Sequence, residues 1–277
     1  MPDKKSTSYP KEKINILFLE NISDVAVKRF TEAGYTNVKK INAAVSEAEL
    51  LKEIKNVHIL GIRSKTNISD HILQAAPKLQ AIGCFCIGIN QVNLDAATAA
   101  GVAVFNAPYS NTRSVAELVI AASIMLMRKI PDKNKAAHEG EWLKDASGSH
   151  EIRGKTIGIV GYGNIGSQVS VLSEALGMKV IFYDAETKLP LGNAADSKSL
   201  KELLQHSDIV TLHVPELSTT KNIINKTTLG YFKKNAVLIN YSRGGVVDLN
   251  ALAKALLNGH LSGAAVDVFP EEPEKNG

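Results

Sequence analysis

The sequence predicts an α/β protein with two domains, each an open parallel sheet built from βαβ units. Short β-rich runs alternate with helical stretches, and this alternation occurs in two series along the chain. The length of 277 residues is sufficient for two domains, and a glycine motif at residues 161–166 lies where the second series begins. We therefore expect one domain over residues 1–110 and another over residues 111–277.

The first series combines β-rich runs with helices. The β-rich runs span residues 14–19, 57–62, 79–86 and 102–106, and two of the helical stretches between them span residues 24–33 and 46–55. A longer helical pattern over residues 112–129, capped by Asn111 or Thr112, ends before Pro131. We expect this helix to lead from the first domain into the second, followed by a polar stretch at residues 132–153.

The second series follows the glycine motif. Strands are expected at residues 156–160, 179–183, 208–214, 236–241 and 263–268. Parallel sheets of this kind carry helices on both faces, and their ligands bind beyond the carboxyl ends of the strands. The residues that directly follow each strand are therefore the candidate site residues.

Composition excludes several classes of protein. Hydrophobic residues make up 44% and charged residues 22% of the chain, as in globular enzymes and unlike disordered or fibrous chains. The net charge of +4 comes without a lysine-arginine block, which argues against a nucleic-acid partner. No apolar run approaches the roughly 18 residues that span a bilayer, and residues 1–13 have no apolar signal-peptide core behind them, so we expect a cytoplasmic protein without a membrane partner. Cys84 and Cys86 have neither zinc nor C-x-x-C spacing, and no metal is expected.

The run from Lys155 to Gly166 carries the strongest chemical signal in the chain. An apolar β-type segment leads into Gly161-x-Gly163-x-x-Gly166, which opens a helix, and the next strand ends at Asp184. In the dinucleotide-binding (Rossmann) motif the first glycine allows a tight turn, the second lets the backbone approach a pyrophosphate, and the third lets the helix pack on the strand. An acid roughly 20 residues after the glycine motif binds the ribose hydroxyls of the dinucleotide, and it favours NAD over NADP. The alternative is a glycine turn beside a surface aspartate.

Basic and small residues follow the predicted strands of the first domain. Arg63 and Lys65 follow the run at 57–62 and are suited to neutralise a carboxylate or phosphate. Gly88 would let backbone amides approach a small anion, and Asn111 and Arg113 follow the run at 102–106. These residues predict a small anionic substrate. Two of these residues have an equally good structural explanation. Lys65 could be a solvated surface lysine, and Asn111 could be a helix cap.

Three groups of residues resemble the D-isomer-specific 2-hydroxyacid dehydrogenases. The glycine motif is one, Asn240-Tyr-Ser-Arg243-Gly is the second, and Val266-Asp-Val-Phe-Pro-Glu-Glu-Pro273 is the third. Residues 82–88, 105–119 and 188–193 are similar to the branch of the family that acts on a phosphorylated hydroxy acid. The resemblance covers nearly the whole chain after the first dozen residues. It implies a flavodoxin-like substrate-binding domain, a Rossmann domain that binds NAD, and a homo-oligomer.

The resemblance also implies roles for individual residues. Arg243 would bind the substrate carboxylate and polarise its keto oxygen, Glu272 would pair with a histidine acid/base, and Asp267 would lie beside the nicotinamide. Arg243 and Glu272 are thus the candidate catalytic residues. The implied substrate-binding residues are Arg63, Ser64, Lys65, Gly88, Asn111 and Arg113. The implied cofactor-binding residues are Gly161, Gly163, Asn164, Ile165, Gly166, Asp184, His213, Val214, Pro215, Tyr241, Ser242, Arg243 and Asp267.

The chain departs from the family pattern at two places. The family carries its acid/base histidine in a Pro-His-x-Gly motif after the glutamate, and no such motif occurs before Gly277. His213 is the candidate replacement. We expect a fragment that lacks the acid/base histidine, the last strand of the second domain and the segment that completes the first domain. The second departure is Tyr241, where relatives usually have a small residue.

Three functional hypotheses are open on this sequence. The first is NAD-dependent oxidation of a phosphorylated D-2-hydroxy acid. The second is the reaction of another D-2-hydroxy acid or the reduction of a 2-oxoacid such as 2-oxoglutarate. The third is a non-catalytic NAD-binding module, which the missing histidine favours and the presence of Arg243 and Glu272 disfavours.

Overall fold

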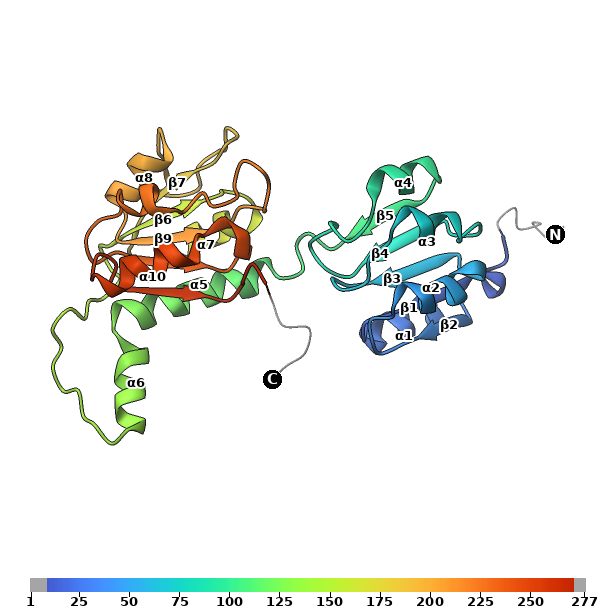
Figure 1. The fold of residues 1–277 in the computed structure, drawn as a ribbon, viewed down its shortest axis with the longest axis horizontal. Coiled ribbons are helices and arrows are strands. Elements are labelled where there is room, and N and C mark those ends of the chain that lie inside the picture. The colour runs from blue at the N-terminus through green and yellow to red at the C-terminus, as the bar shows by residue number, and fades with distance from the viewer. Residues whose placement is uncertain (1–8, 272–277) are drawn as a thin grey trace, which may run out of the picture. The chain divides into compact units, whose positions relative to one another are not determined.

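The computed structural model describes residues 9–271, and the chain divides into two compact units between Asn111 and Thr112. Both units are open sheets of parallel strands with helices packed on them (Figure 1). The predicted fold class, α/β with two parallel sheets, is confirmed. The division lies one residue after the boundary expected from the sequence.

Unit 1 contains a five-stranded sheet in the order β2-β1-β3-β4-β5, and its neighbouring strands are parallel. The strands are β1 (Asn15–Phe18), β2 (Asn37–Lys40), β3 (Ile59–Ile62), β4 (Ala81–Cys84) and β5 (Ala103–Asn106). This order is the flavodoxin-like arrangement that the family resemblance implies. The sequence does not predict β2, because this edge strand is half exposed and two of its four residues are lysines.

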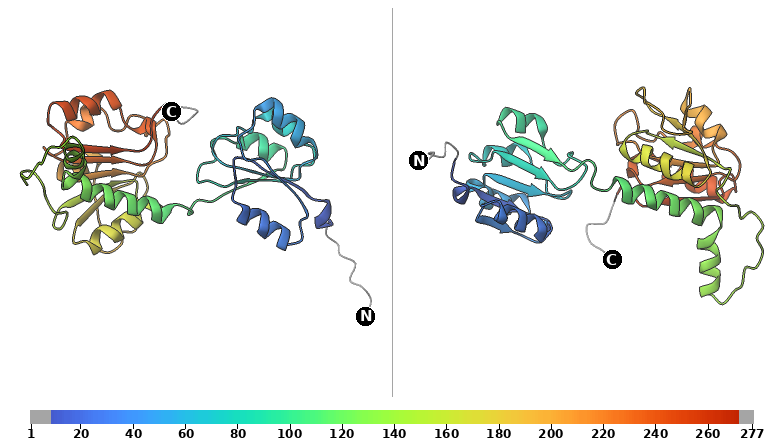
Figure 2. Two further views of the ribbon diagram at one scale, coloured as in Figure 1. Left: turned by 90° about the horizontal axis from the view of Figure 1, so that it is seen from below. Right: turned by 180° about the vertical axis from the view of Figure 1, so that it is seen from behind.

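The helices of unit 1 begin at polar residues whose side chains accept a hydrogen bond from the first turn. The helices are α1 (Asp24–Glu32), α2 (Glu47–Glu53), α3 (Asp70–Gln74) and α4 (Leu94–Ala99), with short 3₁₀ turns at Lys11–Lys13 and Ile54–Asn56. Their N-caps are Ser23, Ser46, Ser69 and Asn93. Helices lie on both faces of the sheet and bury its apolar residues (Figure 2).

Unit 2 contains a six-stranded parallel sheet in the order β11-β10-β9-β6-β7-β8. The strands are β6 (Thr156–Val160), β7 (Lys179–Tyr183), β8 (Ala195–Asp196), β9 (Ile209–Leu212), β10 (Val237–Asn240) and β11 (Gly263–Val266). The order of strand addition reverses at β6, because β7 and β8 lie on one side of it and β9 to β11 on the other. In open α/β sheets, ligands bind at the carboxyl edge beside such a reversal.

Two layers of helices cover the unit 2 sheet. The covering helices are α5 (Thr112–Met127), α7 (Asn164–Ala175), α8 (Leu200–His206), α9 (Lys226–Leu229) and α10 (Leu249–Leu257), with a 3₁₀ turn at Gly244–Val246. Helix α6 (Ile130–His138) follows α5 and projects away from the sheet (Figure 1). α5 and α7 share one apolar cluster with the sheet, and α8, α9 and α10 share the other (Figure 2). Within residues 9–271, no helix has both the length and the apolar character needed to cross a membrane.

Helix α6 corrects an expectation from the sequence. The sequence predicts a polar stretch from residue 132 onward, because Pro131 ends the preceding helical pattern. In the structure, Lys129 adopts a left-handed conformation with φ of 53° after α5, and Pro131 stands in the first turn of α6. Proline is tolerated there because the first-turn amides have no intrahelical partner in any case.

Candidate functional site

The carboxyl edge of the unit 2 sheet brings the candidate residues of this unit into one row. Asp267 follows β11, Tyr241 follows β10, His213 follows β9, Gly161 follows β6, and Asp184 follows β7. These strands are hydrogen-bonded neighbours in that order, so the five loops are adjacent although they are far apart in the sequence. The edge therefore assembles a single candidate site from five separate loops.

The turn between β6 and α7 requires glycine at two of its three motif positions. Gly161 has φ of 93°, and a Cβ atom there would lie 2.6 Å from the carbonyl oxygen of His213. A Cβ atom on Gly166 would overlap the carbonyl oxygen of Gly161, which belongs to the backbone and cannot move aside. A Cβ atom on Gly163, in contrast, would have no neighbour within 4 Å. The first and third glycines thus serve the fold, and the open space at Gly163 is available to a ligand.

The N-terminus of α7 has the donors that a pyrophosphate needs. Gly163 is the N-cap and contributes no side-chain hydrogen bond to the helix. The amide of Ser167 donates to the carbonyl of Gly163 at 2.9 Å, so the amides of Asn164, Ile165 and Gly166 precede the first bonded turn. Such amides, together with the helix dipole, favour a negatively charged group. The residues present therefore fit a dinucleotide phosphate.

The carboxylate of Asp184 is fixed beside this turn by two backbone amides. Oδ2 accepts from the amide of Tyr162 at 2.7 Å, and Oδ1 accepts from the amide of Glu186 at 3.0 Å. These bonds hold the acid at the end of β7, next to the glycine turn at the end of β6. This is the position that a ribose-binding acid requires in a dinucleotide site.

Tyr162 is a support of the turn that the sequence analysis does not single out. Its ring is buried and stacks on Phe182 with the centroids 3.9 Å apart. Its hydroxyl lies 3.0 Å from Oγ of Ser170 in α7 and accepts from the amide of Leu191 at 3.2 Å. The side chain thus ties the glycine turn to α7 and to the segment after β7. Its place inside the glycine motif was the only sequence signal for this role.

His213 lies at the end of β9 and is not arranged as a proton donor. Its Nε2 is 3.0 Å from the hydroxyl of Thr211, and its Nδ1 is buried without a partner among the described residues. Burial lowers the pKa of the imidazole to about 4, so the ring is neutral near pH 7. An imidazole with so low a pKa is a weak base, and it is not protonated near pH 7, so it is poorly suited to exchange a proton with a substrate oxygen at that pH. The geometry therefore does not favour His213 as the replacement acid/base.

A buried asparagine organises the loop after β10. Asn240 is fully buried, and its Oδ1 accepts from the amide of Ser242 at 3.2 Å and from its hydroxyl at 2.9 Å. Its Nδ2 donates to the carbonyl of Arg243 at 3.0 Å. The loop is thus rigid at its base, while the side chain of Arg243 is exposed and one guanidinium nitrogen donates to the carbonyl of Ser242 at 2.7 Å. An exposed guanidinium on a rigid loop is suited to bind a carboxylate.

Tyr241 and Asp267 are neighbours at the ends of β10 and β11. The amide of Asp267 donates to the carbonyl of Asn240 at 3.2 Å, which joins the two loops. Tyr241 is partly buried and packs against the cluster that includes α5 and α7. Burial, together with the charge of Asp267, raises the pKa of the phenol. Glu272, the second candidate catalytic residue, lies outside the described residues.

Two loops of unit 1 bring together part of the predicted substrate side. Arg63, Ser64 and Lys65 follow β3 and are exposed, while Gly88 lies in the loop after β4. Nε2 of the buried Gln91 donates to the carbonyl of Arg63 at 2.6 Å and lies 3.2 Å from the carbonyl of Gly88. This amide group joins the two loops at the carboxyl edge of the sheet. The predicted anion-binding residues of these loops therefore form one connected surface.

The remaining predicted substrate residues lie at the junction between the units. Asn111 is the last residue of unit 1, and Arg113 stands in the first turn of α5 in unit 2. Nε of Arg113 lies 2.6 Å from Oε1 of Glu117, one turn along the same helix. Arg113 therefore belongs to a different unit from the loops at Arg63 and Gly88.

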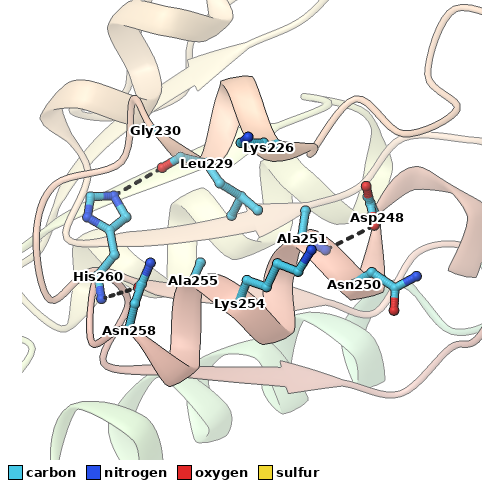
Figure 3. Close-up of a pocket in the computed structure, with 10 residues that line it drawn as sticks. All are labelled: Lys226, Leu229, Gly230, Asp248, Asn250, Ala251, Lys254, Ala255, Asn258 and His260. Carbon is cyan, nitrogen blue, oxygen red and sulfur yellow. Dashed lines mark hydrogen bonds between the residues drawn. The ribbon is translucent and has the colours of Figure 1, made fainter.

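A cavity of about 460 Å³ lies elsewhere in unit 2, between α9 and α10 (Figure 3). None of the candidate site residues lines it. His260 lies 3.1 Å from the carbonyl of Leu229, and Asp248 accepts from the amide of Ala251 at 3.0 Å, so both groups serve the local fold. In residues 9–271 there is also no group of three or more His, Cys, Asp or Glu side chains that could hold a metal ion.

Comparisons with known proteins agree with this geometry. Residues 120–277 match the family described as D-isomer specific 2-hydroxyacid dehydrogenase, NAD binding domain. The chain is 54% identical over 266 residues to D-3-phosphoglycerate dehydrogenase of Haemophilus influenzae, and 51% identical over 269 residues to that of Escherichia coli K12. These alignments cover 96% and 97% of this chain but only 65% and 66% of the relatives, so the chain spans about two thirds of their length.

Solved structures show the same fold. The TT0316 protein of Thermus thermophilus matches with a TM-score of 0.84 and 30% identity, over 95% of this chain and 85% of that one. The D-lactate dehydrogenase of Aquifex aeolicus, solved with NAD and lactic acid, matches with a TM-score of 0.80 and 28% identity, over 93% and 78% of the two chains. Together with the matched NAD-binding domain, these findings confirm the cofactor predicted from the glycine motif.

Proposed function

The chain belongs to the D-isomer-specific 2-hydroxyacid dehydrogenase family, and from this premise we propose that its gene product oxidises 3-phospho-D-glycerate to 3-phosphooxypyruvate with NAD⁺. This reaction opens L-serine biosynthesis. The observation that carries the proposal is the identity of 54% and 51% to two D-3-phosphoglycerate dehydrogenases over nearly all of this chain. The exposed basic loop of unit 1 supports it, because a phosphate ester with a carboxylate needs several donors.

The residues of unit 2 divide the remaining work between cofactor and substrate. The amides at the start of α7 bind the pyrophosphate, and Asp184 accepts hydrogen bonds from the ribose hydroxyls. NAD⁺ supplies the acceptor for the hydride that leaves the carbinol carbon. Arg243 binds the substrate carboxylate and polarises the keto oxygen through its guanidinium. Tyr241, Asp267 and the loop after β9 line the cofactor in this proposal.

On the substrate side, we assign the phosphate to the loops of unit 1. Arg63, Ser64 and Lys65 offer a guanidinium, a hydroxyl and an ammonium group, and Gly88 offers close backbone approach. Asn111 and Arg113 complete the proposed set. Glu272 is proposed, from the resemblance alone, to orient the histidine acid/base of the family.

The test is the oxidation of NADH, followed at 340 nm, by the 277-residue chain and by the full product of its gene. Each is assayed with 3-phosphooxypyruvate, 2-oxoglutarate and pyruvate. We expect the full product to have its highest kcat/KM with 3-phosphooxypyruvate. We also expect Arg63→Ala to raise KM for 3-phosphooxypyruvate more than KM for the other two oxoacids. A KM that Arg63→Ala leaves unchanged would contradict the substrate assignment.

Two other outcomes define the competing functions. A higher kcat/KM with another 2-oxoacid would make the protein a reductase of that acid, as its structural likeness to a D-lactate dehydrogenase also allows. Binding of NADH without turnover of any 2-oxoacid by the full product would favour a non-catalytic NAD-binding module. We further propose a cytoplasmic homo-oligomer, which sedimentation of the full product and its location after cell fractionation would test.

A further inference from the structure

A buried carboxylate holds the backbone of the basic loop in unit 1. Glu20 lies two residues after the end of β1 and is 7% exposed. Its Oε1 accepts from the amide of Arg63 at 3.1 Å and from that of Thr66 at 2.9 Å, while Oε2 accepts from the amide of Lys65 at 3.0 Å. One side chain thus takes three of the four amides in the segment 63–66.

The backbone around this carboxylate is in an unfavourable conformation. Glu20 has φ of 58° and Asn21 has φ of 53°, a left-handed region that suits glycine and is rarely adopted by glutamate. A turn that served only to leave β1 would be better made with glycine at residue 20. The glutamate is therefore explained by what its side chain does, because its three hydrogen bonds offset the backbone conformation and the burial of a charge.

The carboxyl group is ionised under ordinary conditions. Burial alone raises its pKa, but the hydrogen bonds donated by the amides of Lys65, Thr66 and Arg63 outweigh burial and hold the pKa below its usual value. An ionised carboxylate accepts several amide hydrogen bonds at once, which a neutral amide side chain cannot match. The charge of Glu20 is therefore part of the way it holds the loop.

Gln91 fixes the same loop from its other side. It is 4% exposed, and its Nε2 donates to the carbonyl of Arg63 at 2.6 Å. The same nitrogen lies 3.2 Å from the carbonyl of Gly88 and 3.3 Å from Sγ of Cys86. Glu20 and Gln91 therefore engage the inward backbone groups of the segment, while the side chains of Arg63, Ser64 and Lys65 remain exposed.

From this arrangement we infer that Glu20 and Gln91 are positioning residues that hold the loop 63–66 in the conformation that binds the anionic substrate. The inference rests on the proposed function of this loop. Neither residue is proposed to contact the substrate. Each residue holds the loop ordered before the substrate binds, so that less conformational entropy is lost on binding.

Electrostatics makes the sign of the effect a sharp test. A negative charge behind an anion-binding loop repels the anion, so removal of the charge alone would tighten substrate binding. Loss of loop positioning would weaken it. Glu20→Gln removes the charge and keeps the size of the side chain. A lower KM for the substrate would therefore indicate that the charge effect dominates, and a higher KM that the loss of loop positioning dominates.

The experiment uses the full product of the gene with Glu20→Gln and Gln91→Met. The matched control is Glu53→Gln, which removes a carboxylate of the same unit that bonds only Lys39 among the described residues. We expect KM for 3-phosphooxypyruvate to rise about 10-fold in both test variants, with KM for NADH unchanged and kcat within about 3-fold. The control is expected to behave as wild type.

An unchanged or lower KM in Glu20→Gln overturns the inference, as does an equal rise in KM for NADH, which would indicate general damage to the fold. If Glu20→Gln does not fold, Gln91→Met decides by the same criteria, because it changes no charge. If the wild type prefers another 2-oxoacid, the proposed substrate fails, and the same KM comparison with the preferred acid tests the positioning. If it turns over none, calorimetric Kd values for 3-phosphoglycerate decide, and no binding by the wild type overturns both proposals.

Discussion

Two glycines of the turn between β6 and α7, Gly163 and Gly166, should respond to alanine in opposite ways. Gly166→Ala places a Cβ atom on the carbonyl oxygen of Gly161, and overpacking against backbone costs about 3 kcal/mol. For a unit of this size that corresponds to a fall in Tm of about 10 °C. Gly163→Ala meets no atom within 4 Å, so we expect a change in Tm of no more than about 2 °C.

For cofactor binding we expect the variant with little effect on stability, Gly163→Ala, to have the direct effect. Because we place the close approach of the pyrophosphate at Gly163, a methyl group there should cost about 1–3 kcal/mol of binding free energy, or about 5- to 150-fold in Kd for NADH. Differential scanning calorimetry and NADH fluorescence titration of the two variants measure both quantities. A Gly163→Ala protein that bound NADH as wild type would refute the placement of the phosphates at this turn.

Three further outcomes follow from the same edge of the sheet. Burial lowers the pKa of His213 from 6.5 to about 4, so between pH 7 and pH 5 the unfolded chain takes up a proton that the folded chain does not, and the wild type loses about 2 kcal/mol of stability. His213→Gln should lack this loss in urea titrations at the two pH values, and equal pH dependence in both proteins would contradict it. Tyr162→Phe removes the bonds to Ser170 and Leu191 and should lower the free energy of unfolding by about 1–2 kcal/mol, whereas an unchanged urea midpoint would show that these bonds contribute nothing. Asp184→Asn should narrow the preference for NADH over NADPH by about 10-fold in Kd, because a carboxylate repels the 2′-phosphate, and an unaltered ratio would remove Asp184 from the ribose site.

The β-rich runs of the sequence predicted the buried strands well, and the two missed strands have a common cause. β2 and β8 are polar strands at the edges of their sheets, and each is held by pairing with one neighbouring strand and not by burial of apolar side chains. Neither has the apolar run by which a buried strand is recognised. Helix α6 was missed because Pro131 predicts the end of the preceding helix, whereas proline is also common in the first turn of a new helix, where it stands in α6.

The candidate site was predictable only where a residue lies within a few positions of the end of an apolar strand. That rule placed Gly161, Asp184 and Arg243 at one edge of the sheet, and it would also have found Glu20, two residues after the end of β1. Gln91 could not have been found, because its role depends on two loops that meet only in the folded unit.

The reversal of strand order at β6 has a consequence for how the cofactor site forms during folding. The half that we propose binds the phosphates and ribose, made by β6, α7 and β7, is continuous in sequence and needs only contacts between neighbouring segments. The other half needs β9 to return past β7 and β8 and pair with β6, and then β10 and β11 to add in turn. Non-local pairing of this kind is slow, because the entropy of closing the intervening chain is lost before the contacts are gained. We therefore expect the phosphate half to become protected from hydrogen exchange before the nicotinamide half during refolding.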